Sequence, residues 1–154
     1  MIPNLVSLPG TPWSVLPAGV HQATLSEIAD RFVYNQWRRD LFDGLVLASR
    51  NLVQAGCKRL FLDGSFVTDK PVPRDYDACW HPDGIDINLI DPVFKIFDDN
   101  RVSQKKKFGG EFFPSTLPNE AGRNFVDFFQ IDKHTGLQKG ILLIDLANDS
   151  ILQP

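Results

Sequence analysis

The sequence has few of the residues that mark secreted, membrane-bound or metal-stapled proteins. Its two cysteines, Cys57 and Cys79, lie far apart and show no metal-ligand spacing, so reduced thiols in the cytoplasm are the expected state. The N-terminus has no basic stretch followed by an apolar one, and no apolar run approaches the ~20 residues that a membrane span requires. We therefore expect a cytoplasmic protein without a membrane partner.

Basic residues are also scarce for a protein that coats nucleic acid. The 16 Lys and Arg are outnumbered by 19 Asp and Glu, which gives a formal net charge of −3. This balance argues against general nucleic-acid binding, while a local basic groove is still compatible with it. With 154 residues, 43% of them hydrophobic, the chain is long enough for one domain with a real core. Its 12 Phe and single Met predict a core rich in aromatic rings.

Proline and glycine are concentrated in residues 1–22. Because proline fixes its own φ and favours extended backbone in the residue before it, this segment is not expected to be helical. Trp13 and several aliphatic side chains indicate that it packs against the rest of the protein. We predict an extended leader over residues 1–22, docked on a single domain over residues 23–154.

The rest of the chain alternates between helix and strand patterns. Thr24 and Glu27 have the spacing of a capping box. One apolar face at helical spacing is formed by Trp37, Leu41, Leu45, Ala48 and Leu52, and Gly56 follows as the expected C-terminal cap. The expected elements are helices over 25–35 and 36–55, strands over 59–63 and 75–80, a helix over 86–97, a strand over 108–113, a helix over 122–131 and a strand over 141–144. This order predicts an α+β or mixed α/β fold, a small mixed sheet packed by helices.

The strand over 59–63 and the strand that follows it carry residues suited to phosphate and metal binding. Gly64 has no Cβ, so the backbone N–H and hydroxyl of Ser65 can approach a phosphate oxygen. Asp75 and Asp77 alternate along a strand and therefore share one face. Two adjacent carboxylates repel each other unless a cation or a proton lies between them, and Mg²⁺ prefers such oxygen ligands. The competing interpretations are a plain turn at Gly64 and a solvated strand edge.

These residues lie in the stretch LDGSFVTDKPVPRDYDACW, which resembles the signature of the DNA polymerase beta-like nucleotidyltransferase superfamily. That signature is an apolar strand, Gly-Ser, a short gap and Asp-x-Asp or Asp-x-Glu. The stretches LPAGVHQATLSEIADRF and FFQIDKHTGLQKGILLIDL resemble a family of small bacterial proteins within it. The resemblance implies a nucleotidyltransferase-like fold that binds Mg²⁺ or Mn²⁺ and moves an NMP from an NTP to a hydroxyl of RNA (such as tRNA), a protein or a small molecule.

The same resemblance implies a third carboxylate on a neighbouring strand. Glu111 is the predicted one, completing a catalytic and metal-binding set with Asp75 and Asp77, and its competitors are Asp86, Asp127 and Asp145. The expected nucleotide-binding residues are Gly64, Ser65, Thr68 and Lys70. For Thr68 and Lys70, and for the basic run over 105–107, solvated loop positions are the competing interpretation.

Two other functions stay open on the sequence alone. The chain could be a non-catalytic partner with the same fold in a toxin–antitoxin or phage-defence pair, because small nucleotidyltransferases are often encoded beside such partners. A short chain also has little material for a nucleobase pocket, which a partner encoded nearby or a homo-oligomer could supply. The other alternative is a sensor that holds metal and NTP without turnover.

Overall fold

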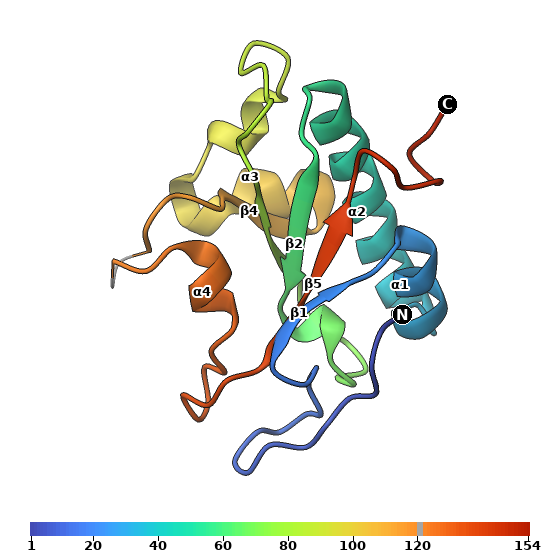
Figure 1. Ribbon diagram of the computed structural model, residues 1–154, viewed down its shortest axis with the longest axis vertical. Helices are drawn as coiled ribbons and strands as arrows, with labels where there is room; N and C mark the ends of the chain where they lie inside the picture. Colours follow the sequence, from blue (N-terminus) through green and yellow to red (C-terminus); the bar gives the residue numbers. More distant parts are fainter. Residues whose placement is uncertain (120–121) are drawn as a thin grey trace.

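A computed structural model describes residues 1–119 and 122–154, and within them it has an α+β fold (Figure 1). A mixed sheet of five strands runs in the order β1-β5-β2-β3-β4, accompanied by four α-helices in the described chain. The strands are β1 (Gly19–Gln22), β2 (Arg59–Asp63), β3 (Tyr76–Trp80), β4 (Gly110–Pro114) and β5 (Gly140–Asp145), and the helices are α1 (Leu25–Phe32), α2 (Gln36–Gln54), α3 (Asp98–Phe108) and α4 (Phe125–Phe129). Two short 3₁₀ helices, η1 (Ser65–Val67) and η2 (Pro92–Lys95), lie in the connections.

The sheet has two faces that are covered differently. Strand β2 is antiparallel to both β5 and β3, while β1 pairs with β5 and β3 with β4 in parallel. On one face, Leu60, Leu62 and Ala78 belong to the main core with residues of α1, α2 and α3. On the other face, Phe61, Cys79, Phe129 and Ile141 form a smaller cluster under α4. Because side chains alternate along a strand, Asp63 and Asp77 lie on the α4 face.

The first two helices follow their predicted signals. The hydroxyl of Thr24 accepts from the backbone N–H of Glu27, and the Glu27 carboxylate accepts from the backbone N–H of Thr24, both at 3.1 Å. The buried residues of α2 include the predicted apolar positions Leu41, Leu45, Ala48 and Leu52. Trp37, at the start of that face, is 49% exposed and lies outside the core, with its indole N–H donating to the carbonyl of Pro73.

The prediction of a helix over 86–97 is wrong. This segment forms turns and the short η2, because the carboxylates of Asp86 and Asp91 accept backbone N–H groups two residues ahead, at 3.0 and 2.9 Å. Such local bonds compete with helix formation. The helix lies later, as α3, and ends at Gly109, whose φ is +84°. The third strand accordingly begins at Gly110 and not at Phe108.

Helix α3 begins with an unusual backbone turn. Asp99, Asn100 and Arg101 have φ values of 50°, 56° and 61°, all in the left-handed region. Side chains with a Cβ are disfavoured there by roughly 1–2 kcal/mol each in a left-handed helix. The turn is therefore strained, and it ends at the residue whose guanidinium reaches Glu111 on β4.

Residues 1–22 lie against the rest of the protein, and their end forms β1 at the edge of the sheet. Val6 and Val15 exchange backbone hydrogen bonds, which closes a hairpin between them. Arg31 of α1 donates to the carbonyls of Ile2 and Pro3. The hairpin is further held where the backbone N–H of Ser14 donates to the Asp69 carboxylate, at 2.8 Å.

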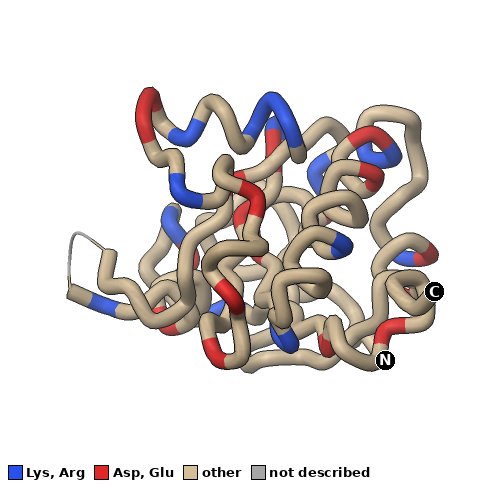
Figure 2. The backbone as a smooth tube through the Cα atoms, turned by 90° about the horizontal axis from the view of Figure 1, so that it is seen from above, with Lys and Arg blue, Asp and Glu red and all other residues tan. Residues whose placement is uncertain are grey.

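Charges of both signs are spread along the tube in Figure 2, which fits the small net charge of the chain. The part of the chain that the structure describes has no helix that is long and apolar enough to cross a membrane. Cys57 and Cys79 are both buried and are not joined in a disulfide.

Candidate functional site

A row of acidic side chains crosses three neighbouring strands on the α4 face. In the register of the sheet, Asp63 of β2 lies opposite Asp77 of β3, and Asp77 lies opposite Glu111 of β4. Asp75 immediately precedes β3 and lies two residues before Asp77, so it lies on the same side. Neighbouring strands are ~5 Å apart, so the structure brings together the three predicted carboxylates and adds Asp63.

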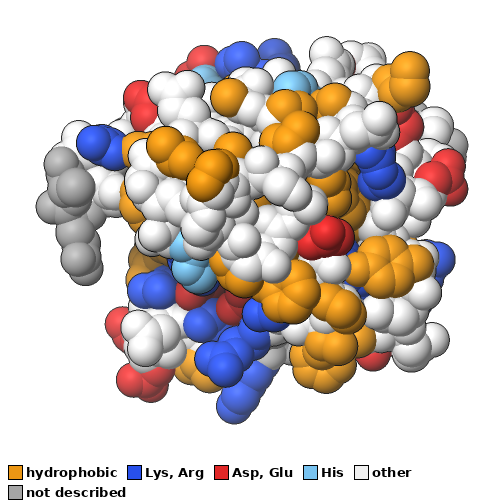
Figure 3. Space-filling model, turned by 90° about the horizontal axis from the view of Figure 1, so that it is seen from below, with side chains coloured by type: hydrophobic (Ala, Val, Ile, Leu, Met, Phe, Trp, Pro, Cys, Tyr) orange, Lys and Arg blue, Asp and Glu red, His pale blue; other side chains and the backbone are white. Residues whose placement is uncertain are grey.

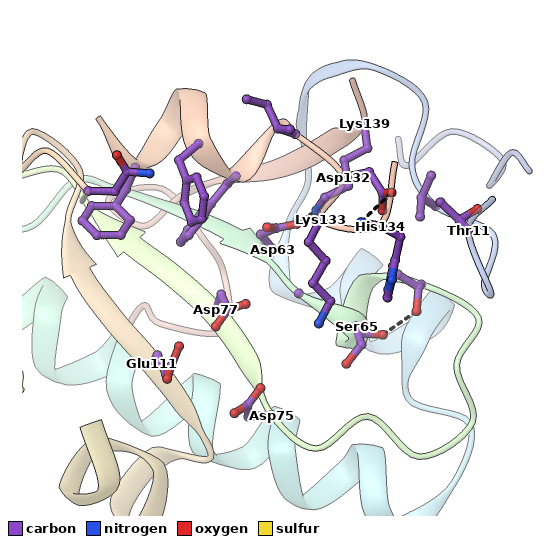
Figure 4. A pocket seen from close by; sticks show the side chains of 18 of the residues that line it. Thr11, Asp63, Ser65, Asp75, Asp77, Glu111, Asp132, Lys133, His134 and Lys139 are labelled. Carbon is purple, nitrogen blue, oxygen red and sulfur yellow. Dashed lines mark hydrogen bonds and ion pairs between the residues drawn. The ribbon is translucent and has the colours of Figure 1, made fainter. Parts of the chain in front are cut away.

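All four carboxylates line one cavity of about 750 Å³. Figure 4 shows Asp75, Asp77 and Glu111 on one side of it and Ser65 beside them, with Lys133 and His134 coming from the segment before β5. In the space-filling view from below, acidic side chains lie recessed between basic ones, next to a histidine (Figure 3). The cavity is large enough for a small organic ligand and not only for an ion.

Three of the four carboxylates lie within ion-pair distance of protein cations. The Glu111 carboxylate accepts from Arg101 at 3.0 Å and from Lys105 at 3.1 Å. The ammonium of Lys105 also lies 3.9 Å from Asp75, and Lys139 forms an ion pair with Asp63. Asp77 takes part in no ion pair with any described residue, although it lies in the middle of the row.

The pKa values reflect this arrangement. Burial raises the pKa of Asp77 well above its ordinary value, and the neighbouring Asp63, Glu111 and Asp75 raise it further. Burial also acts to raise the pKa of Glu111, but hydrogen bonds from Asp77, Lys105 and Arg101 outweigh it and lower the pKa. The surroundings of Asp77 therefore favour its neutral form or an added cation, whereas those of Glu111 favour its ionised form.

Gly64 brings the end of β2 close to Asp77. Its φ is +95°, and a Cβ at this position would lie 3.0 Å from the backbone N of Asp77 and 3.2 Å from its Oδ2. Glycine tolerates both the positive φ and the close approach to Asp77 because it has no Cβ. Ser65 follows at the start of η1, and its carbonyl accepts from the Thr68 hydroxyl at 2.6 Å. Gly64, Ser65 and Thr68, three of the four predicted nucleotide-binding residues, all line the cavity.

Lys70 is not among the residues that line the cavity. Its backbone carbonyl accepts instead from the guanidinium of Arg38, which is fully buried in α2. The same guanidinium donates to the carbonyls of Phe66 and Thr68, at 2.6 and 2.9 Å. Arg38 thus holds the loop after Gly64 from within, a role that the sequence analysis did not assign.

The competitors of Glu111 lie elsewhere. Asp86, Asp127 and Asp145 do not line the cavity. Asp86 accepts from the backbone of Asn88 at 3.0 Å, and Asp145 accepts from the amide side chain of Asn148 at 2.8 Å. Of these four candidates for a third acid, Glu111 is the one that lines the cavity.

Two segments that the sequence analysis left out of the site close the cavity beside Ser65. The tip of the leader contributes Thr11 and Trp13, and the loop before β5 contributes Lys133. In Figure 4, Lys133 extends towards the carboxylates. Burial raises the pKa of Asp63 and of Asp75, and the charge of Lys133 offsets a small part of this rise. This ammonium is suited to bind a phosphate as a point charge.

The opposite end of the cavity is apolar. The residues that line it there are Phe113, Phe125, Phe128, Phe129 and Ile131. Phe113 lies two residues after Glu111 on β4, so this wall begins beside the acidic row. Helix α4 carries residues 125, 128 and 129, and all three line the cavity.

The acidic row matches Mg²⁺ or Mn²⁺ in donor type, because these ions prefer carboxylate oxygens, and Asp77 is buried among other acids. The three predicted ligands are not gathered around one point. Among residues 1–119 and 122–154, no three Asp, Glu, His or Cys side chains form a group that could hold a metal ion. Arg101 and Lys105 hold Glu111 instead.

A family model matches residues 11–145, a span that contains every candidate residue of this site. The family is DUF6932, described as a family of unknown function. No curated protein and no solved structure matches the chain.

Proposed function

The chain belongs to DUF6932, a family of unknown function, and from its site we propose that it is a metal-dependent nucleotidyltransferase. It would move an NMP from an NTP to a hydroxyl of RNA, a protein or a small molecule. The supporting observation is the order of features around one cavity: Gly64-Ser65 at the end of β2, Asp75 and Asp77 at β3, and Glu111 on β4. We include in this proposal that β2, β3 and β4 form the core of a nucleotidyltransferase-like fold.

The proposed reaction is an in-line displacement at the α-phosphorus of the NTP. The acceptor oxygen forms a bond to this phosphorus as the bond to the bridging oxygen breaks, and pyrophosphate leaves. The acceptor gives up one proton to a carboxylate or to water. Divalent metal, when bound, would neutralise charge on the attacking and leaving oxygens.

Each group of residues has a role in this scheme. Ser65 and Lys133 would bind the β- and γ-phosphates at one end of the cavity, since both line it and can donate hydrogen bonds. Asp75 and Asp77 would hold the metal, which would replace the proton that Asp77 needs in its buried position. Glu111, which is ionised, would complete the set or accept the acceptor's proton.

The test is transfer of label from each common NTP carrying a radioactive α-phosphate. The full-length chain is incubated with Mg²⁺ or Mn²⁺ and with total RNA or cell lysate as acceptor. We expect label in one acceptor fraction, and its loss in Asp77→Asn. Asp145→Asn, which changes an acid outside the cavity, is the matched control and should retain transfer. The proposal fails if no fraction is labelled and calorimetry detects no NTP binding that depends on the metal.

A second candidate function is a non-catalytic partner protein of a toxin–antitoxin or phage-defence pair. It is favoured by the ion pairs of Glu111 with Arg101 and Lys105, and of Asp63 with Lys139, which neutralise carboxylates without a metal. Co-purification of a stoichiometric protein, with no transfer of label by the complex or by the free chain, would support this function over the enzyme.

A further inference from the structure

The apolar end of the cavity has aromatic rings that are open to solvent. Phe128 is 44% exposed and lines the cavity together with Phe125 and Phe113. Phe129, the buried member of this wall, is anchored in the cluster with Phe61, Cys79 and Ile141. A concave apolar surface next to polar groups is typical of a binding site for a small organic molecule.

The rings of this wall are already ordered against one another. Phe113 and Phe125 are stacked, with centroids 4.2 Å apart and an angle of 8° between their planes. Phe97 stacks on Phe113 at 6.0 Å, away from the cavity lining, while Phe128 packs edge-on against Phe125 at 6.2 Å. A surface that is ordered in advance loses little conformational entropy when it binds a ligand.

The wall continues the cavity in the direction that an NTP would take. Ser65 lies at one end and the acidic row in the middle, and aromatic rings lie beyond Asp77 and Glu111 on the side away from Ser65 (Figure 4). With the β- and γ-phosphates at Ser65 and the α-phosphate at Asp77, the ribose and base would extend past Phe113 towards Phe125 and Phe128. The volume of about 750 Å³ leaves room for a nucleoside beyond the phosphates.

We propose that Phe125 and Phe128 form the nucleobase subsite of this cavity, and that Phe113, whose ring is already stacked with Phe97 and Phe125, supports them. This inference rests on the proposed function and adds the part of the substrate that the carboxylates do not recognise. A base is a flat ring whose faces pack favourably on aromatic side chains, and such contacts discriminate little between bases. The subsite therefore binds purine NTPs better than pyrimidine NTPs by contact area, and it does not select strictly between adenine and guanine.

Two ligands separate the base from the phosphates in the test. Calorimetry with Mg²⁺ compares ATP with inorganic tripolyphosphate on wild type, Phe128→Leu and Phe125→Leu. Because an aromatic ring stacked on a base contributes about 1–3 kcal/mol, we expect each variant to weaken ATP binding about fivefold or more and to leave tripolyphosphate binding within about twofold. Phe97→Leu makes the same change in the same stack outside the cavity, and should retain ATP binding.

Phe128 lies largely outside the core, so Phe128→Leu is less disruptive to the fold than Phe125→Leu. Circular dichroism verifies that the variant is folded. The inference is overturned if tripolyphosphate binds wild type as tightly as ATP, if ATP and tripolyphosphate weaken together, or if Phe97→Leu matches Phe128→Leu. Metal-independent binding, or no binding of either ligand, would reject the proposed nucleotidyltransferase itself. The inference is also overturned if Phe128→Leu no longer transfers label to the acceptor but binds ATP as wild type does. The wall would then bind the acceptor.

Discussion

Asp77 of β3 lies directly opposite Glu111 of β4 in the parallel register, and hydrogen bonding between their carboxyl groups moves the two pKa values apart. Two acids with the same intrinsic chemistry thus shift in opposite directions, with the pKa of Asp77 raised and the pKa of Glu111 lowered. The difference arises from their surroundings: burial among other acids for Asp77, and contact with Arg101 and Lys105 for Glu111.

The first prediction concerns the stability of the metal-free protein when Asp77 is changed to Asn. The folded-state pKa of Asp77 is raised, so the stability it contributes is present below its unfolded pKa of about 4 and is lost as pH rises towards the folded pKa. Asn does not titrate. The free energy of unfolding of Asp77→Asn should therefore exceed that of wild type by about 1 kcal/mol or more near neutral pH. This difference should shrink as the pH is lowered.

Urea unfolding at a series of pH values without divalent cations measures this gap. The control is Asp83→Asn, because the Asp83 side chain is 83% exposed and should give no comparable trend. A gap that stays constant with pH would show that the Asp77 carboxyl is not held protonated in the folded state.

The second prediction separates two demands on Gly64. Gly64→Ala and Gly136→Ala both introduce a Cβ at positive φ, +95° and +74°. The new Cβ at Gly64 would meet Asp77 at 3.0 Å, whereas at Gly136 no described atom lies within 4 Å. Both should lose about 1 kcal/mol from backbone strain, and Gly64→Ala should lose a further ~1 kcal/mol or more and weaken binding of ATP with Mg²⁺. Equal losses would mean that contact with Asp77 is unimportant.

The third prediction tests whether Arg38 holds the loop after Gly64. Replacing its fully buried guanidinium by Met leaves the carbonyls of Phe66 and Thr68 without their donor. Since each unsatisfied buried group costs about 1–3 kcal/mol, Arg38→Met should lower the free energy of unfolding by about 3 kcal/mol or more and speed hydrogen exchange over 66–70. Arg39→Met, at the adjacent exposed position, should change stability by about 0.5 kcal/mol or less. Slow exchange over 66–70 in Arg38→Met would contradict this role.

The fourth prediction addresses the left-handed turn at the start of α3. Asp99→Gly should raise the free energy of unfolding by about 1 kcal/mol, because φ is 50° at this residue and glycine has no Cβ penalty there. Lys106→Gly, in the later part of the same helix, should lower it by about 1 kcal/mol. Thermal unfolding of the two variants beside wild type provides the comparison, and a loss at both positions would argue against strain at Asp99.

The fifth prediction concerns thiol reactivity. Burial raises the pKa of Cys57 to about 11, and burial also raises the pKa of Cys79. Because the thiolate is the reactive form, iodoacetamide at about pH 8 should label native protein slowly and denatured protein fast at both positions. Mass spectrometry over a time course follows this, and rapid labelling of native Cys57 would contradict it.

Part of this site was predictable because it depends on local patterns. Gly64 and Ser65 end one strand, and Asp75 and Asp77 alternate on the next, so their common side follows from strand geometry. Glu111 lies on the strand that adjoins Asp77, and the resemblance to nucleotidyltransferases implied a third acid on a neighbouring strand. The α+β architecture was predictable for a similar reason, since most elements carry clear helical or strand periodicity.

The remaining residues of the site could not be identified in this way. From the segment before β5, Lys139 pairs with Asp63 and Lys133 lines the cavity. Arg101 pairs with Glu111 and lies in a backbone turn that non-glycine residues rarely adopt. Their positions depend on tertiary packing. Asp63 did carry one overlooked signal, as the single acid inside an otherwise apolar strand end. The prediction of a helix over 86–97 failed for a local reason. The apolar pattern there favours a helix, but the aspartates in the same segment favour turns.

The pairing of β1 with β5 has a consequence for how the protein folds. These strands lie near residues 20 and 140, yet they are hydrogen-bonded neighbours in the sheet. Closing so long a loop is entropically costly and slow, and on the ribosome it cannot occur until β5 has been synthesised. Strands β2, β3 and β4 can associate earlier, so the acidic row could assemble before the leader and the loop at Lys133 close over it.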